Sequence, residues 1–337
     1  MLAARSPGSP LALDAGPLPL DAVLRARHRL RGVLPPIPLT YSAGLSGLCG
    51  CEVYVKPECF LPTRSFKVRG ALNKVHRLAT EHAVTHVVAA SAGNHGQGVA
   101  WAARHHGIAA TVVVPQGANR AKVDAMRSLG ADVRMVGATF EDARDEALRL
   151  AARDGAGFVE AFDDLDVIAG QATVGLEVAE DGLDLDQLVV PIGGGGLVAG
   201  VAACLRTLGV RTRIVGVQPE QAPSMARSLA AGVITAVPAH TCADGLATSR
   251  PGRLPFAIAR RFVDDILLVT EDELIEAMRT VLRLEHILTE PAGAASVAAL
   301  VHHVRPRPGT RVGVILSGGN PAPAVLRRVL DDESISG

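Results

Sequence analysis

The chain has 337 residues, of which 48% are hydrophobic, and its net charge at pH 7 is zero. This length and composition predict a soluble protein with an ample core, in one large domain or two closely packed ones. Without a basic excess, and with only 3% aromatic residues, the chain lacks the kind of surface on which nucleic acid binds.

The first twenty residues are rich in proline, glycine, serine and leucine without a regular period, so we expect a loose tail over residues 1–20. Pro10, Asp14 and Pro17 interrupt the apolar run that a secretory signal would need. The five cysteines form no Cys-x-x-Cys pair. We therefore expect a reduced, cytoplasmic protein without a membrane partner.

Six short runs rich in β-branched residues predict strands, and helical patterns separate most of them. They cover residues 85–90, 110–115, 131–136, 187–192, 213–217 and 311–316. Among the helices, residues 271–284 follow Thr270, a suitable N-cap, and carry acidic residues in the first turn. This alternation predicts an α/β fold with a parallel sheet and helices on both faces.

Lys67 is one of only four lysines among the 34 basic residues, and it lies in the stretch T-R-S-F-K-V-R-G-A, residues 63–71. An arginine keeps its proton in a protein, whereas a lysine in a partly apolar pocket can become a neutral amine that attacks carbonyls. Lys67 is therefore a candidate nucleophile. Taken alone, it is more simply a solvated surface charge.

Two further loops carry polar groups at expected strand ends. The stretch S-A-G-N-H-G-Q-G, residues 91–98, opens a helix, and its Ser91, Asn94 and His95 are candidates to bind a carboxylate. The stretch L-S-G-G-N, residues 316–320, offers the Ser317 hydroxyl and an amide at Asn320. Ligands of open parallel sheets bind at such strand ends.

Residues 188–205 carry no charge, and 18 such residues approach the length of a membrane span. Pro191 and a run of four glycines would break a spanning helix, so we predict a strand, a tight loop and a helix instead. The loop consists of Gly193, Gly194, Gly195 and Gly196. A loop without side chains in front of a helix can hold a phosphate.

The same glycines leave other functions open. Gly194, Gly196 and Ala199 also fit the loose G-x-G-x-x-A pattern of dinucleotide binding, with Glu220 about twenty residues further on. A nicotinamide-dependent oxidoreductase is therefore an alternative of a different class. A third hypothesis is that the loop is a flexible glycine hinge that binds no ligand.

Seven motifs in this order together resemble the fold type II pyridoxal-phosphate enzymes, specifically the threonine and serine dehydratase (ammonia-lyase) branch, which is related to serine racemase. The motifs are residues 65–71, 91–98, 167–173, 191–197, 264–273, 290–294 and 317–320. The resemblance implies a fold like that of the tryptophan synthase β chain, with two parallel-rich αβα domains and the cofactor between them. The large domain would comprise residues 1–85 and 164–337, and a small mobile domain residues 86–163.

The resemblance also implies the cofactor, pyridoxal 5'-phosphate, and the residues that hold it. Lys67 would bind the cofactor covalently and later act as a base, and Phe66 would lie beside the ring. The loop from Gly193 to Gly196 would bind the phosphate. Asn94 would hydrogen-bond the ring oxygen, and Ser317 would meet the pyridine nitrogen.

The implied substrate is a β-hydroxy amino acid such as L-threonine or L-serine, whose carboxylate the loop of Ser91, Asn94 and His95 would take. The implied reaction is β-elimination to a 2-keto acid and ammonia. We expect a homodimer. Because the chain ends near residue 337, we expect no regulatory domain and no feedback inhibition by isoleucine.

Departures from the family pattern bear on the choice within it. Racemases of this fold carry a second serine where this chain has Ala92, which disfavours racemisation, and S-A-G-N-H differs from the loop of β-replacement synthases. Gln218 and Ser224 stand where the racemase metal loop has carboxylates, so we expect no metal. Arg64 replaces the usual glycine, and it either selects an acidic or larger substrate or points to solvent. A catalytically silent binding protein is a further alternative.

Overall fold

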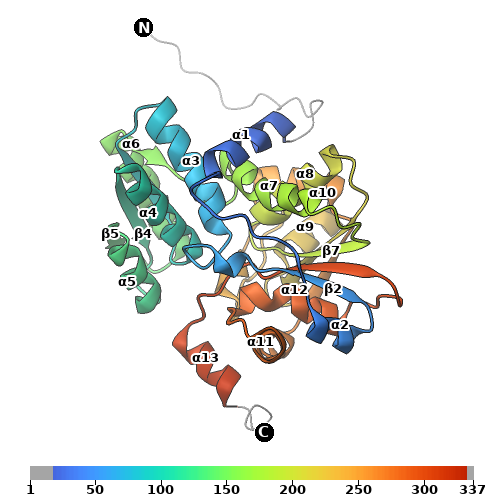
Figure 1. The fold of residues 1–337 in the computed structure, drawn as a ribbon. Helices are drawn as coiled ribbons and strands as arrows, with labels where there is room; N and C mark the ends of the chain where they lie inside the picture. The colour runs from blue at the N-terminus through green and yellow to red at the C-terminus, as the bar shows by residue number, and fades with distance from the viewer. Residues whose placement is uncertain (1–17, 332–337) are drawn as a thin grey trace.

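Two separate β-sheets organise residues 18–331, the part of the chain that the computed structural model describes. Six strands in the order β1-β2-β10-β7-β8-β9 form one sheet, and four strands in the order β5-β4-β3-β6 form the other. Every pairing is parallel except that of β1 with β2. Figure 1 shows the four-stranded sheet with α4, α5 and α6 on one side of the molecule and the larger sheet on the other.

The strands are β1 (Thr40–Tyr41), β2 (Glu52–Lys56), β3 (His86–Ala90), β4 (Ala109–Val114), β5 (Asp132–Met135), β6 (Gly157–Phe158), β7 (Gln187–Pro191), β8 (Arg213–Pro219), β9 (Asp265–Val269) and β10 (Arg311–Ile315). The helices are α1 (Leu20–Leu30), α2 (Ala43–Cys49), α3 (Lys67–Glu81), α4 (Asn94–His106), α5 (Arg120–Ser128), α6 (Phe140–Asp154), α7 (Leu165–Glu180), α8 (Gly196–Thr207), α9 (Ser224–Ala231), α10 (Arg253–Phe262), α11 (Glu271–Glu285), α12 (Pro291–His302) and α13 (Pro323–Leu330). Two short 3-10 turns are η1 (Glu58–Phe60) and η2 (Asp244–Leu246).

All six strand predictions are confirmed, as β3, β4, β5, β7, β8 and β10. The predictions missed β1 and β6, which have two residues each, and β2, whose run E-V-Y-V-K mixes charged and apolar residues. They also missed β9 as a strand, although its residues belong to one of the quoted motifs. Of the predicted tail, residues 1–17 lie outside the described residues, whereas Leu18 is buried and Leu20 begins α1.

The larger sheet has helices on both faces because its strands alternate their side chains between two cores. Val189 and Val314 face one core together with α11 and α12. Leu188, Val190 and Ile315 face the other core, together with α7 and α8. Figure 1 shows this arrangement, with α7, α8 and α10 on one face and α2, α11 and α12 on the other.

The smaller sheet follows the same rule. Val87 and Val112 pack with α3, α4 and α5, whereas Val88 and Val113 pack with α6. As a result α4 is held between its own sheet and α3, the helix that begins at Lys67. The parallel sheet with helices on both faces is thereby confirmed for both sheets.

Two predictions about local structure are also confirmed. Residues 188–205 form β7, a glycine loop and the first ten residues of α8. Thr270 caps α11 in a capping box, in which its hydroxyl accepts from Glu273 N and the Glu273 carboxylate accepts from Thr270 N. In the described part of the chain no helix combines the length and the apolar character that crossing a membrane requires.

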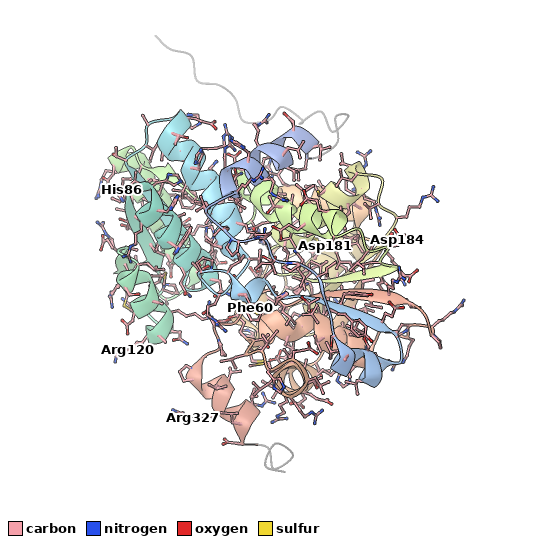
Figure 2. All side chains as sticks on the ribbon, viewed as in Figure 1. Phe60, His86, Arg120, Asp181, Asp184 and Arg327 are labelled. Carbon is pink, nitrogen blue, oxygen red and sulfur yellow. The ribbon has the colours of Figure 1, made fainter. Side chains whose placement is uncertain are left out.

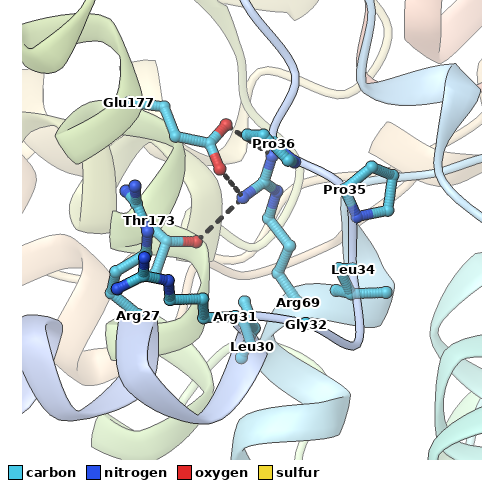
Figure 3. A pocket seen from close by; sticks show the side chains of 10 residues that line it. All are labelled: Arg27, Leu30, Arg31, Gly32, Leu34, Pro35, Pro36, Arg69, Thr173 and Glu177. Atoms are coloured by element: carbon cyan, nitrogen blue, oxygen red, sulfur yellow. Dashed lines mark hydrogen bonds and ion pairs between the residues drawn. The ribbon is translucent and has the colours of Figure 1, made fainter.

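A buried ion network fixes the start of α3 to the rest of the molecule. The Arg69 guanidinium donates to both oxygens of Glu58, at 2.7 and 2.8 Å, and to both oxygens of Glu177 on α7, at 2.7 Å each. The Lys56 ammonium lies 2.8 Å from Glu177 Oε2. Figure 3 shows Arg69, Thr173 and Glu177 along a pocket between α1 and α7. Two cations and two carboxylates thus neutralise one another around Arg69, two residues after Lys67 in the chain.

Candidate active site

The N-terminus of α3 brings Lys67 together with the two polar loops. Ser65 Oγ accepts from Lys67 N at 3.2 Å, which satisfies one of the free N–H groups at the start of the helix. Phe66 N donates to Ser317 O at 3.2 Å, and Ser65 pairs with Gly318 in an isolated bridge. Gly98 of α4 packs so closely that an added Cβ would lie 3.3 Å from the Lys67 carbonyl. The loops 91–98 and 316–320 therefore both border Lys67.

The Lys67 amine has few polar neighbours. Its Nζ donates to Ala161 O at 2.9 Å and lies 5.4 Å from the ring centre of Phe66 and 5.9 Å from that of Phe162. Burial lowers the pKa of Lys67 to about 8, because the apolar surroundings disfavour the charged form. The neutral amine is therefore accessible near neutral pH, as a nucleophile or a base requires.

The glycine loop lies between β7 and α8, and its walls leave no room for side chains. A Cβ added at Gly193 would lie 2.9 Å from Gly245 O, and one at Gly194 would lie 2.4 Å from the Phe162 ring. Gly195 has φ +97°, a left-handed conformation that favours glycine. Phe162 also faces Lys67 Nζ, so the loop and the amine share one wall. Backbone N–H groups without side chains at a helix N-terminus can bind an anion.

Asn94 begins α4 and makes two hydrogen bonds across the site. Its Nδ2 donates to Glu290 Oε1 at 2.5 Å, and its Oδ1 accepts from Asn320 Nδ2 at 2.8 Å. These two bonds fix the direction of the amide, and they leave its second N–H for a ligand. Gly293 lets the Ser317–Asn320 loop come close, because a Cβ there would lie 2.0 Å from Gly318 O.

Ser91 and His95 flank Asn94 in different environments. Ser91 follows β3, and its hydroxyl accepts from Gly93 N at 3.2 Å. The His95 ring is buried, with Nε2 3.0 Å from Val159 O. Burial first, and the nearby Lys67 charge second, lower the pKa of His95 to about 3, so the ring is neutral. Because a carbonyl only accepts, the Nε2 carries the proton, and Nδ1 has no N–H to offer.

The structure brings other residues to the site that the sequence predictions did not assign to it. Phe162 and the Ala161 carbonyl face the amine, and Thr248 Oγ1 approaches the glycine loop. Glu290 stands at the start of the 290–294 motif, and its carboxylate accepts from Asn94. Of these residues only Glu290 lies in one of the seven motifs, and nothing in the sequence shows that the four face the same site. Gln218 Oε1 accepts from Met225 N and Ala226 N at the start of α9, so this amide is committed to the helix.

Arg64 occupies the glycine position of the family pattern and has φ +56°, a left-handed conformation. Its exposed side chain reaches over the Ser317–Asn320 loop, with Nε 3.3 Å from Gly319 O and one terminal nitrogen 3.4 Å from Leu288 O. The positive φ explains why glycine suits this position. The two carbonyl contacts hold the guanidinium on backbone groups.

The Arg64→Gly variant is expected to keep the stability of the parent chain within about 1 kcal/mol, because relief of the left-handed backbone is offset by unfolded-state entropy and the lost contacts. Ala83→Gly is the matched control, since exposed Ala83 has φ +52° and no polar side chain to lose. Chemical denaturation of both variants measures the difference. If Arg64→Gly loses catalytic activity while its stability holds, then Arg64 serves the active site and not the stability of the fold.

A model of the family described as "Pyridoxal-phosphate dependent enzyme" matches residues 30–318. The L-threonine ammonia-lyase of Thermotoga maritima is 41% identical over 93% of this chain and 78% of its own length. The catabolic L-threonine dehydratase of Escherichia coli is 39% identical over 90% of this chain and 93% of its own length. Among solved structures, the processed threonine deaminase isoform 2 of Solanum lycopersicum is 34% identical with a TM-score of 0.85, covering 92% of this chain and 93% of that one. Maize serine racemase is 30% identical with a TM-score of 0.87, covering 95% and 98%.

The fold and the site therefore define an α/β enzyme of fold type II with a lysine amine beside a glycine loop at a helix N-terminus. The chain belongs to the pyridoxal-phosphate-dependent enzyme family. Its residues fit that cofactor on structural grounds, because a partly desolvated amine and a loop without side chains meet at one wall. The expectations of this fold, of this cofactor and of a lyase are confirmed. The nicotinamide alternative is not supported.

Proposed function

We propose that this protein is an L-threonine ammonia-lyase, which converts threonine to a 2-keto acid and ammonia by β-elimination, with L-serine as a second substrate. The observation that carries the proposal is the half-buried Lys67 amine next to the glycine loop and Ser317. The relatives named as threonine ammonia-lyases or dehydratases, at 39 to 41% identity, support this choice of substrate.

Each residue of the site has a proposed role. When bound, pyridoxal phosphate would withdraw electrons from the amino-bearing carbon of the substrate. The backbone of Gly193 to Gly196 would hold its phosphate, and Phe66 would lie beside its ring. The second N–H of Asn94 would donate to the ring oxygen. The Ser317 hydroxyl, now 3.2 Å from Ala292 O, would turn toward the ring nitrogen.

The chain's own groups also manage the proton and the carboxylate. The Lys67 amine would take the proton from the substrate's α-carbon, which its lowered pKa allows. Ser91 and the backbone N–H groups at the start of α4 would bind the substrate carboxylate. His95 would contribute to this carboxylate site by anchoring the loop to Val159. Ala92 has no proton to deliver to the opposite face, which argues against racemisation.

We further propose that residues 86–163 form a small domain that moves against a large domain of residues 1–85 and 164–337. The strands β3 to β6 all fall within the smaller segment, which supports this division. Closure over the substrate would exclude water. The homodimer and the cytoplasmic location remain predictions from the sequence.

The purified protein, loaded with pyridoxal phosphate, is expected to release equal amounts of 2-keto acid and ammonia from L-threonine, with no second substrate and no nicotinamide. A coupled keto-acid assay measures this, with D-threonine and D-serine as control substrates. Three outcomes contradict the proposal. They are interconversion of L- and D-serine without keto acid, product formation only with an added nucleophile, and absence of any turnover despite bound cofactor.

A further inference from the structure

Lys122 is a buried lysine that the mechanism above does not use. It lies on α5, which begins at Arg120 (Figure 2), and its exposed fraction is only 6%. Its Nζ lies 2.5 Å from Asp244 Oδ2 and 3.7 Å from Glu290 Oε2. Burying an ammonium costs free energy unless acidic groups pair with it. Lys122 therefore ties α5, which packs on the smaller sheet, to two carboxylates from the part of the chain that contains the larger sheet.

The two carboxylates differ in their surroundings. Half of the Asp244 side chain is exposed, whereas Glu290 is 1% exposed, and its Oε2 has no hydrogen-bond partner in the described part of the chain. The charged and titratable groups that act most strongly on Glu290 are Lys122 from α5 and Asp244 from η2, and the Cys59 thiol lies within its influence. Lys122 is the cation among these groups. Burial raises the pKa of Glu290 to about 7, and Lys122 acts against this rise.

The ionisation of Glu290 decides how Asn94 can be held. A carboxylate only accepts, so Asn94 must turn its NH₂ group to Glu290, and its Oδ1 is then placed to accept from Asn320. A protonated carboxyl can instead donate to Asn94 Oδ1, which would allow the amide to turn over and would break the bond from Asn320. The charge on Lys122 thus favours one of two amide orientations.

We propose that Lys122 is a positioning residue of the active site, whose ammonium favours the ionised form of Glu290 and thereby the orientation of the Asn94 amide that presents its second N–H to the cofactor ring. The last part rests on the proposed function, which assigns Asn94 to the ring oxygen. The pairing of Lys122 with Glu290 does not depend on that assignment. The two parts can be tested separately.

The first test follows the Glu290 carboxyl by infrared difference spectroscopy of the holoenzyme across pH, with Glu290→Gln to assign the band. In Lys122→Met the midpoint is expected to rise by about 1 pH unit or more, because the opposite charge is gone. Lys122→Arg is expected to keep the midpoint of the parent chain. Asp244→Asn is expected to lower the midpoint, because the second carboxylate near Glu290 has lost its charge. An unchanged midpoint in Lys122→Met overturns the pairing, whether or not the protein is a lyase.

The second test measures the dissociation constant of pyridoxal phosphate and the pH profile of its absorption. Lys122→Met is expected to bind the cofactor about tenfold more weakly, as for a loss of one oriented hydrogen bond. Lys122→Arg is expected to bind it like the parent chain. Arg127→Met is the matched control, since Arg127 lies on the same helix and pairs with exposed Asp124. A shifted carboxyl midpoint with unchanged cofactor affinity would overturn the link to Asn94.

Discussion

Lys67→Ala is expected to lose the near-visible absorption of the bound cofactor. The rate of keto-acid release is expected to fall by a factor of roughly 10² to 10⁴. Lys67 Nζ is the amine that faces the glycine loop wall, where it donates to Ala161 O. The other three lysines cannot replace it, because each pairs with a carboxylate. Absorption spectra and a keto-acid assay on the cofactor-loaded variant measure both effects.

Lys74→Ala is the matched control for this experiment. Lys74 lies two turns further along α3 and pairs with Asp164 at 2.7 Å and Asp166 at 3.1 Å. Its removal breaks two ion pairs of the same helix but changes no residue of the site. The cofactor absorption and the rate of keto-acid release are therefore expected to stay close to those of the parent chain. A normal spectrum in Lys67→Ala would remove Lys67 from the proposed chemistry.

The sequence predicts the fold well where periodicity and loop composition decide the local structure. The six β-branched runs, the capped helix after Thr270 and the glycine turn at 193–196 are all found where the residues predict them. The positions of β1 and β6 could not be predicted, because two residues carry no period. Tertiary pairing with neighbouring strands creates these short elements.

In the candidate site, too, some residues can be predicted from the local sequence, whereas others depend on tertiary contacts. The motifs supply Lys67, Asn94 and the glycine loop, because each stands in a stretch whose residue types suit its chemistry. The roles of Glu290 and Lys122 depend on contacts between segments far apart in the chain, which a single sequence does not show. A lysine in a helix with alternating charges reads as a surface residue, and only packing reveals that Lys122 is 6% exposed.

Arg69→Met is expected to destabilise the protein by about 3–5 kcal/mol, because it leaves the carboxylates of Glu58 and Glu177 buried with one remaining cation, Lys56. Arg69 is 1% exposed and makes four bonds to these two carboxylates, at 2.7 to 2.8 Å. The variant removes the charge while it keeps much of the side-chain volume. Denaturant unfolding of both proteins, monitored by circular dichroism, measures the difference in free energy of unfolding.

Arg27→Met is the control, since Arg27 lines the same pocket (Figure 3) but pairs with Glu180 in an exposed bridge of 2.5 Å. Such a bridge contributes about 0–1 kcal/mol. If Arg69→Met and Arg27→Met lost equal free energies of unfolding, the buried network would not be what holds α3. Burial alone would raise the pKa of Glu177, but Arg69 and Lys56 hold it below its ordinary value of 4.5. The contribution of ionised Glu177 to the free energy of unfolding is therefore present above pH 4.5 and is lost as the pH falls. The difference in free energy of unfolding between the parent chain and Arg69→Met is expected to become smaller in acid.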